Sequence, residues 1–202
     1  TGHPLHRYEM SIRSMTDIQL AEQSKVMDGQ PIVVGGIFTE LRKRRDKKDR
    51  SIAFVMLEDF SGKAECIFWS KAYEENEYLI EQDKVVLVEG KINKKEDTLK
   101  IVVDRVIGIE EAIERSVKGY KIFLNIDEDN ADCIEKLYNV VNGYKEDNKC
   151  IFEFHITDNR NDMKRTYEAQ TKFGFDHEST KKLIKLFHLG KIRYLYNRGE
   201  TF

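Results

Sequence analysis

The densest group of residues that could do chemistry in this sequence is basic. Within residues 42–50 only Asp46 and Asp49 are acidic, and the segment has a net charge of +5. The basic side chains are Arg42, Lys43, Arg44, Arg45, Lys47, Lys48 and Arg50. Cations at this density bind the phosphates of a nucleic-acid backbone, although a charged hairpin tip can also be solvated and do nothing more.

A second group of chemical interest is acidic and follows a short apolar strand. Its members are Asp127, Glu128, Asp129 and Asp132. Such a cluster could be imagined as a two-metal carboxylate site. No second acidic cluster converges on it, however, and acids in a first helical turn commonly stabilise the helix dipole. The histidines lack metal-ligand spacing, and the sequence has no nucleophile elbow, Gly-rich phosphate loop or HExxH motif. We therefore predict no catalytic residue, no metal site and no cofactor in this chain.

Alternation along the apolar segments predicts which side chains face outwards. Small and branched residues of one parity suit a narrow barrel interior: Val55, Leu57, Ala64 and Cys66. The other parity forms an outer face: Phe54, Met56, Ile67 and Trp69. Nucleotide bases can stack on such side chains. Packing in the core or against a neighbouring domain is the competing interpretation, and Glu58 and Glu65 make this face less favourable for phosphate.

The elements that must position these residues are five short β-strands. They are predicted near residues 32–34, 52–57, 64–68, 85–88 and 99–106, with a helix over 70–81. Gly35 and Gly36 permit a bend that lets the first strand join both halves of a closed sheet. A five-stranded barrel with a helix after its third strand is the OB-fold, which we predict over residues 30–110.

The OB-fold gives the charged residues a common location. The basic segment becomes the loop between strands one and two, one of the two loops that usually flank a groove for single-stranded nucleic acid. The loop between strands four and five supplies Lys94, Lys95 and Lys100 from the other side. This placement favours contact with a nucleic-acid backbone over simple solvation.

The remainder of the chain has a different pattern. Residues 1–29 are a lead-in segment, and residues 111–118 belong to a short charged helix that we interpret as a linker. From residue 119 to 202 the periodicity predicts the order β-α-β-β-α-β, with a helix over 134–141, Ser179 as the cap of a second helix, and a last strand over 192–196. The expected fold class is therefore α+β, an OB-fold barrel followed by a small ferredoxin-like domain.

Composition limits the possible functions. The 202 residues carry a net charge of −2, so bulk positive charge cannot drive binding to nucleic acid or to an anionic membrane. The three cysteines support neither a disulfide framework nor a CxxC metal site, and no apolar run is long enough to span a bilayer. We expect a cytoplasmic protein without a membrane partner, and, because the sequence starts without Met, a piece of a longer polypeptide.

Three stretches resemble a known family. The opening TGHPL, residues 52–68 and residues 86–92 look like the C-terminal region of bacterial DNA polymerase III alpha subunits, and they occur in the same order. The resemblance implies that the barrel contacts single-stranded template DNA and that the last domain binds the tau subunit of the clamp loader. It also implies that the polymerase active site and the motif for the sliding clamp lie upstream of this chain.

The predicted function is therefore a non-catalytic module of a replicative DNA polymerase alpha subunit, which binds single-stranded DNA and tau. Two alternatives remain open on the residues alone. One is a protein-interaction module without intrinsic nucleic-acid binding, which the near-neutral total charge favours. The other is the anticodon-binding domain of a class II aminoacyl-tRNA synthetase, because the core motif of residues 52–68 occurs in many OB-folds.

Overall fold

The computed structural model describes residues 4–94, 99–129, 132–142 and 149–202. The chain divides into two compact units, which are described separately here. The first unit comprises residues 1–112 together with Gly199–Phe202, and the second comprises Ile113–Arg198. The first unit ends within helix α3 (Ile109–Ser116), whereas the sequence interpretation places a linker over residues 111–118.

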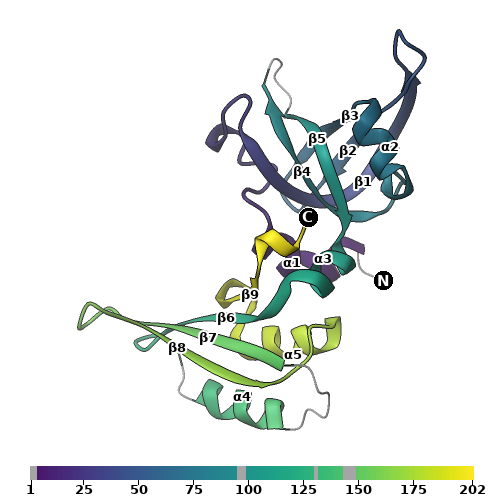
Figure 1. Cartoon of the computed structure of the whole chain (residues 1–202). Coiled ribbons are helices and arrows are strands. Elements are labelled where there is room, and N and C mark those ends of the chain that lie inside the picture. The colour runs from purple at the N-terminus through teal and green to yellow at the C-terminus, as the bar shows by residue number, and fades with distance from the viewer. Residues whose placement is uncertain (1–3, 95–98, 130–131, 143–148) are drawn as a thin grey trace. The chain divides into compact units, whose positions relative to one another are not determined.

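The first unit is a closed five-stranded barrel, as the sequence predicts (Figure 1). The strands pair in the order β1-β2-β3-β5-β4, and the parallel β3–β5 pair closes the barrel. A short helix, α2 (Ser70–Asn76), and the 3-10 turn η3 (Glu77–Leu79) fill the predicted helical position after the third strand. The strands are β1 (Pro31–Arg45), β2 (Ser51–Glu58), β3 (Lys63–Phe68), β4 (Val85–Asn93) and β5 (Lys100–Gly108).

Strand β1 takes part in both halves of the barrel. Its first half, Pro31 to Ile37, pairs with β4, and its second half, from Ile37 to Arg45, pairs with β2. The changeover needs glycine, because a Cβ on Gly36 would lie 2.3 Å from the carbonyl oxygen of Glu58. The predicted role of the Gly35-Gly36 pair is thus explained by the close approach of another strand's backbone.

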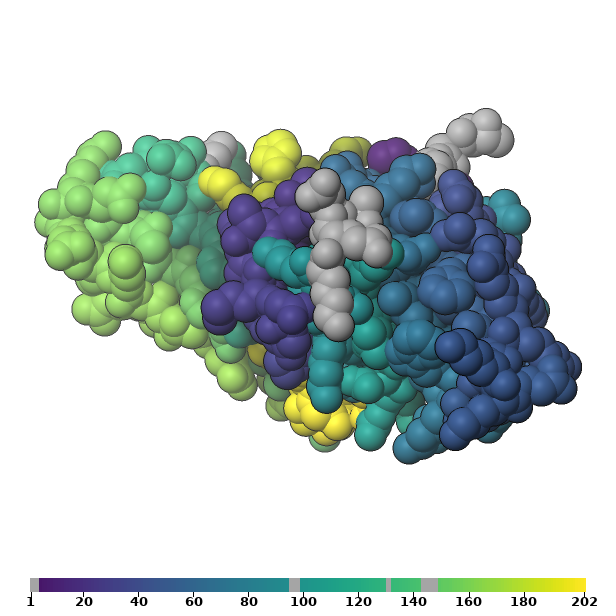
Figure 2. Space-filling model, turned by 90° about the horizontal axis from the view of Figure 1, so that it is seen from above, coloured from purple at the N-terminus to yellow at the C-terminus, as the bar shows by residue number. Residues whose placement is uncertain are grey.

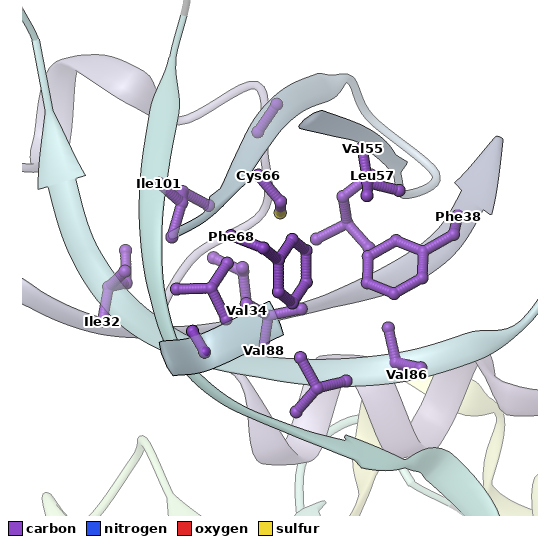
Figure 3. Close-up of a cluster of buried hydrophobic side chains, with 14 of the residues drawn as sticks. Ile32, Val34, Phe38, Val55, Leu57, Cys66, Phe68, Val86, Val88 and Ile101 are labelled. Carbon is purple, nitrogen blue, oxygen red and sulfur yellow. The ribbon is translucent and has the colours of Figure 1, made fainter. Parts of the chain in front are cut away.

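The barrel interior has the parity that alternation predicts. Val55, Leu57, Ala64 and Cys66 are all buried, and they meet large side chains from the other strands (Figure 3). Phe38 and Phe68 pack edge to face there, with ring centroids 6.0 Å apart. This apolar interior is the main source of stability for the barrel, since burying such side chains removes a large apolar area from water.

The lead-in segment packs on the barrel. It contains η1 (Pro4–Tyr8), α1 (Glu9–Met15) and η2 (Gln23–Lys25), and its Leu20 and Val26 belong to the barrel's core. The amide of Leu20 also donates to Asp59 Oδ2, at 2.7 Å. Residues 4–29 are therefore part of the folded first unit.

The second unit contains a four-stranded sheet covered on one face by helices (Figure 1). Its elements follow the predicted order, and η4 (Leu189–Lys191) precedes the last strand while η5 (Arg198–Glu200) follows it. The strands and helices are β6 (Val117–Asn125), α4 (Asp132–Asn142), β7 (Lys149–Asp158), β8 (Met163–Lys172), α5 (His177–Phe187) and β9 (Ile192–Tyr196).

The ferredoxin-like arrangement is not confirmed. The strand order is β8-β7-β6-β9, and β6 pairs directly and in parallel with β7. A split βαβ motif would instead place another strand between these two. The predicted helix cap also differs, because Asp176 accepts hydrogen bonds from the amides of Glu178 and Ser179 and is the true cap of α5. Ser179 itself lies within the helix and is buried.

The core of the second unit is aromatic. The ring of Tyr120 is fully buried among Phe152, Phe173, Phe175 and Tyr194, with centroid distances of 5.4–5.9 Å. Its hydroxyl donates to the carbonyl oxygen of Gly174 at 2.8 Å, which satisfies the one polar atom of this side chain. By contrast, α4 buries only Leu137, although its periodicity predicts an apolar stripe that also includes Ile134 and Tyr138.

Candidate nucleic-acid interface

The basic hairpin, residues 42–50, consists of the end of β1 and the tight turn that leads into β2 at Ser51. The carboxylate of Asp46 organises the turn by accepting from the amides of Lys48 and Arg50, at 2.8 and 2.9 Å. These bonds, with that of the Arg50 side chain, lower the pKa of Asp46 to about 2. Asp49 adopts a left-handed conformation with φ of 58°, which Asp tolerates better than most residues. The two acids of this segment thus shape the loop that presents the cations.

The seven cations of the basic hairpin fall into three groups. Arg45 and Arg50 form ion pairs with the hairpin's own Asp49 and Asp46, whereas Arg42 pairs with Glu65 on β3. Lys43 lies over the ring of Tyr73 in α2, with its Nζ 5.6 Å from the centroid. The remaining three are exposed and form no ion pair with another described residue: Arg44, Lys47 and Lys48. Figure 2 shows this part of the barrel (blue) at the molecular surface.

Cross-strand register places two of the predicted stacking residues, Phe54 and Ile67, in one outer row of the barrel. Arg42 of β1 is the partner of Phe54 on β2, and Phe54 is the partner of Ile67 on β3. Phe54 is half-buried, so part of its ring remains open to a base. Ile67 lies in the same row but is only 6% exposed, which leaves almost no surface for stacking. Trp69, directly after β3, is 51% exposed.

The neighbouring row contains Glu65, the carboxylate that pairs with two cations of this face. Met56 is the partner of Glu65, and Glu65 is the partner of Lys100 at the start of β5. The carboxylate of Glu65 is 2.6 Å from Arg42 Nη2 and 3.5 Å from Lys100 Nζ. The cations that the sequence assigns to two different loops therefore meet on one face, and a carboxylate joins them.

The other lysines of the β4–β5 connection are placed differently. The Nζ of Lys94 donates to the carbonyl oxygen of Val26, and its backbone amide donates to Asp28 Oδ1 at 2.9 Å. Lys94 thus holds the lead-in segment against the barrel, so its ammonium group is already engaged. Lys95 lies outside the described residues.

The acidic group of the second unit has structural partners. Asp129 forms an ion pair with Lys191, and its other oxygen accepts from the amide of Asn125 at 2.7 Å. Asp127 pairs with Arg160 at 2.6 Å. In the part of the chain that the structure describes, no group of His, Cys, Asp and Glu side chains is arranged to hold a metal ion. No helix formed by the described residues is long and apolar enough to cross a membrane.

The charged network on the outer face was only partly visible in the sequence. Alternation assigns Glu65 to the same face as Phe54, but it gives no distance to Arg42, because that distance depends on the register of β1 against β2 and of β2 against β3. The contact of Lys43 with Tyr73 has no local signal either. Asp46 did have a local sequence signal, since an Asp at the start of a tight turn commonly accepts hydrogen bonds from the backbone amides of the residues that follow it.

Comparison with known proteins connects this barrel to a family. Residues 32–108 match a family described as "OB-fold nucleic acid binding domain". Over 129 residues, or 63% of this chain, the sequence is 30% identical to the DNA polymerase III subunit alpha of Pseudomonas aeruginosa. Identity is 32% over 145 residues, or 70% of this chain, with the same subunit of Aquifex aeolicus. The chain resembles DNA polymerase III alpha subunits.

The similarity to DNA polymerase III alpha subunits continues into the second unit. The Borreliella burgdorferi alpha subunit is 24% identical over 189 residues, which covers 92% of this chain. The chain spans only 11%, 12% and 16% of the Pseudomonas, Aquifex and Borreliella proteins. The resemblance predicted from the sequence is confirmed, and it concerns a small part of a much larger polypeptide.

The comparison with solved structures gives matches that all have low TM-scores. The SSB domain of a Synechococcus protein has a TM-score of 0.35 and 15% identity, covering 40% of this chain and 94% of that chain. The second OB-fold domain of replication protein A from Methanococcus maripaludis has 0.32 and 15%, covering 43% and 91%. The asparaginyl-tRNA synthetase of Entamoeba histolytica has 0.36 and 12%, covering 84% and 55%. Values this low carry no functional argument.

Proposed function

We propose that the barrel binds the backbone of single-stranded DNA across its outer face, as a non-catalytic module of a replicative DNA polymerase alpha subunit. The observation that carries the proposal is the meeting of Arg42 and Lys100 on the face that also presents Phe54 and Met56. Cations beside a partly open aromatic ring can hold phosphates while a base stacks. The similarity to alpha subunits supports DNA as the ligand.

We expect the cations without an internal ion pair to contribute most to phosphate binding. Arg44, Lys47 and Lys48 form no ion pair with another described residue and can bind phosphate at no cost in existing contacts. Together with Arg42 and Lys100 they make five candidate phosphate ligands. If all five bind, the logarithm of the binding constant falls with the logarithm of salt concentration at a slope of about −3.5, from about −0.7 for each phosphate on a single strand.

The test is a salt series with a labelled oligothymidylate, read by fluorescence anisotropy. The triple variant Arg44→Ala, Lys47→Ala, Lys48→Ala should reduce the slope by about 2, because three phosphate contacts are lost. A variant with the same loss of charge, Lys181→Ala, Lys182→Ala, Lys185→Ala on α5, should leave the slope unchanged. A slope near zero for the natural sequence, or an equal effect of both triple variants, would remove the proposed DNA-binding role.

For the second unit we propose binding to the tau subunit of the clamp loader. The support is the similarity to an alpha subunit that extends over this unit, together with exposed apolar side chains that a partner protein could cover. Ile134 and Tyr138 on α4 are 43% and 66% exposed, and Tyr167 on β8 is 52% exposed. On this proposal the sliding clamp is bound only by upstream parts of the polymerase, and the protein acts in the cytoplasm.

A binding assay with purified tau tests the second role. Ile134→Asp combined with Tyr138→Asp on α4 should weaken binding at least tenfold, because charge would then have to be buried in the interface. Glu135→Gln with Asn139→Asp on the same helix is the control, since both residues are exposed and polar. Unchanged affinity of the α4 double variant would place the tau surface elsewhere, and no binding by the natural chain would remove the tau role.

One alternative function has a specific observation in its favour. Five of the predicted phosphate ligands already have an ion-pair or hydrogen-bond partner within the chain: Arg42, Arg45, Arg50, Lys94 and Lys100. This is what a pure protein-interaction module would show, since its surface charges need no external anion. Binding to tau together with no oligonucleotide binding at low salt would favour that function over the first.

A further inference from the structure

Glu65 is the acidic residue on which two cations of the barrel's outer face converge. Its side chain is 15% exposed and lies between two cations, Arg42 from β1 and Lys100 from β5. The pairing of β3 with β5 does not depend on this side chain, because the backbone amide of Glu65 already donates to the carbonyl oxygen of Leu99 at 2.9 Å.

The arrangement has the chemistry of a phosphate site with a carboxylate in it. An Arg guanidinium and a Lys ammonium converging on two oxygens of one anion is how proteins hold a backbone phosphate. Here the anion belongs to the chain, and it reduces the net charge of this group from +2 to +1. Phe54 is in the adjacent row, with Arg42 as its direct cross-strand partner, so a strand stacked on Phe54 would bring its phosphates to these cations.

We propose that Glu65 is an internal competitor for the DNA backbone, which occupies Arg42 and Lys100 until a phosphate displaces it. The inference rests on the proposed DNA-binding function of the barrel and adds a residue that limits its affinity. Each binding event exchanges an internal ion pair for an external one, so the gain for that phosphate is small. The strand is consequently held by the unpaired cations of the basic hairpin and only weakly at the barrel face.

Replacing Glu65 by Gln tests the inference, because Gln keeps the size and one acceptor oxygen but removes the charge. With Glu65 offsetting one of the five candidate cations, the natural chain should show a slope of about −2.8. In the variant one more phosphate is fully neutralised, so the slope should steepen to about −3.5 and affinity at about 0.1 M salt should rise about fivefold. Thermal unfolding followed by circular dichroism checks that the variant is folded. The same substitution in a chain that also carries Arg42→Ala and Lys100→Ala should leave the slope unchanged.

Glu58 provides a matched control on the same pair of strands. It forms an ion pair with Lys63 at 2.8 Å, and Lys63 is its direct partner on β3. Glu58→Gln changes the net charge by the same amount, yet it frees a cation that is not among the proposed phosphate ligands. Its slope and affinity should match those of the natural sequence, and a gain equal to that of Glu65→Gln would overturn the inference by showing a general charge effect.

The other outcomes separate this inference from the function on which it rests. If the natural chain binds DNA with the expected salt slope and Glu65→Gln binds equally or more weakly, the competitor role is overturned and the DNA-binding function stands. Weaker binding would identify Glu65 as a residue that positions the two cations. If neither protein binds at low salt, the proposed function and this inference fail together.

Discussion

At the scale of single residues, the acids of this chain decide what its cations can do. Asp46 and Asp49 fold the tip of the basic hairpin, while Glu65 holds two cations on the barrel face. The sequence shows the excess of positive charge in residues 42–50, but it does not show how that charge is distributed among internal partners. Three cations of the basic hairpin form ion pairs within the chain and a fourth, Lys43, lies over the ring of Tyr73, whereas the other three form no ion pair with another described residue.

Asp46 allows a direct check of the hairpin geometry. Its pKa of about 2 is set first by the backbone amide of Arg50 and then by the Arg50 side chain. Because this pKa is depressed below that of an unfolded Asp, the interaction is fully present above about pH 4 and is lost as the pH falls through 2. A carboxyl titration by NMR should give a value near 2, and Arg50→Ala should raise it only partly, since the backbone amide remains. A titration at the ordinary Asp value in the natural chain would contradict the turn described here.

At the scale of elements, the alternation of side chains along the strands and the Gly35-Gly36 pair were sufficient to predict the barrel. Its strands alternate because one face is buried, and Gly35 and Gly36 mark the strand that crosses between both halves. The extent of β1 was not predictable, because its polar end from Thr39 to Arg45 is held by pairing with β2 rather than by burial. The strand order of the second sheet was not predictable either, since local periodicity contains no information on which strands become neighbours.

The β2–β3 turn offers a test of how the elements are joined. The buried carboxylate of Asp59 accepts from the amides of Ser61 and Gly62 and, through its second oxygen, from the amide of Leu20 in the lead-in segment. Asp59→Ala leaves these donors unpaired in a buried site and should lower the free energy of unfolding by about 3 kcal/mol. Asp104→Ala, at an exposed position of β5, should cost less than about 0.5 kcal/mol. Urea unfolding measures both, and equal effects would show that Asp59 does not anchor the turn.

At the scale of the whole molecule, the net charge and the number of free cysteines do not show where charge or thiol reactivity is located. The net charge is −2, yet one hairpin of the barrel unit has +5. The proposed nucleic-acid site therefore depends on the position of the cations on the barrel, which the sequence predicts through the OB-fold. It also depends on which side chains already neutralise them, and that requires the register of four strands, β1, β2, β3 and β5. The cysteines give a similar contrast, because all three are free but only one is within reach of solvent.

The cysteines can report on the two units separately. Cys66 is buried in the barrel and Cys150 in the second unit, and burial raises the pKa of both thiols, that of Cys150 to about 12. Since the thiolate is the reactive form, the native chain should react with a thiol reagent at Cys133 alone, whereas the denatured chain should react at three sites.

A urea series on the Cys133→Ser variant follows the opening of each unit. Labelling of Cys66 reports on the barrel and labelling of Cys150 on the second unit, and peptide mass spectrometry resolves the two. If the chain consists of two units with separate cores, the two labels can appear at different urea concentrations, and Leu57→Ala in the barrel core should shift the midpoint of Cys66 more than that of Cys150. Rapid reaction of Cys66 or Cys150 in the native chain would contradict the buried cores described here.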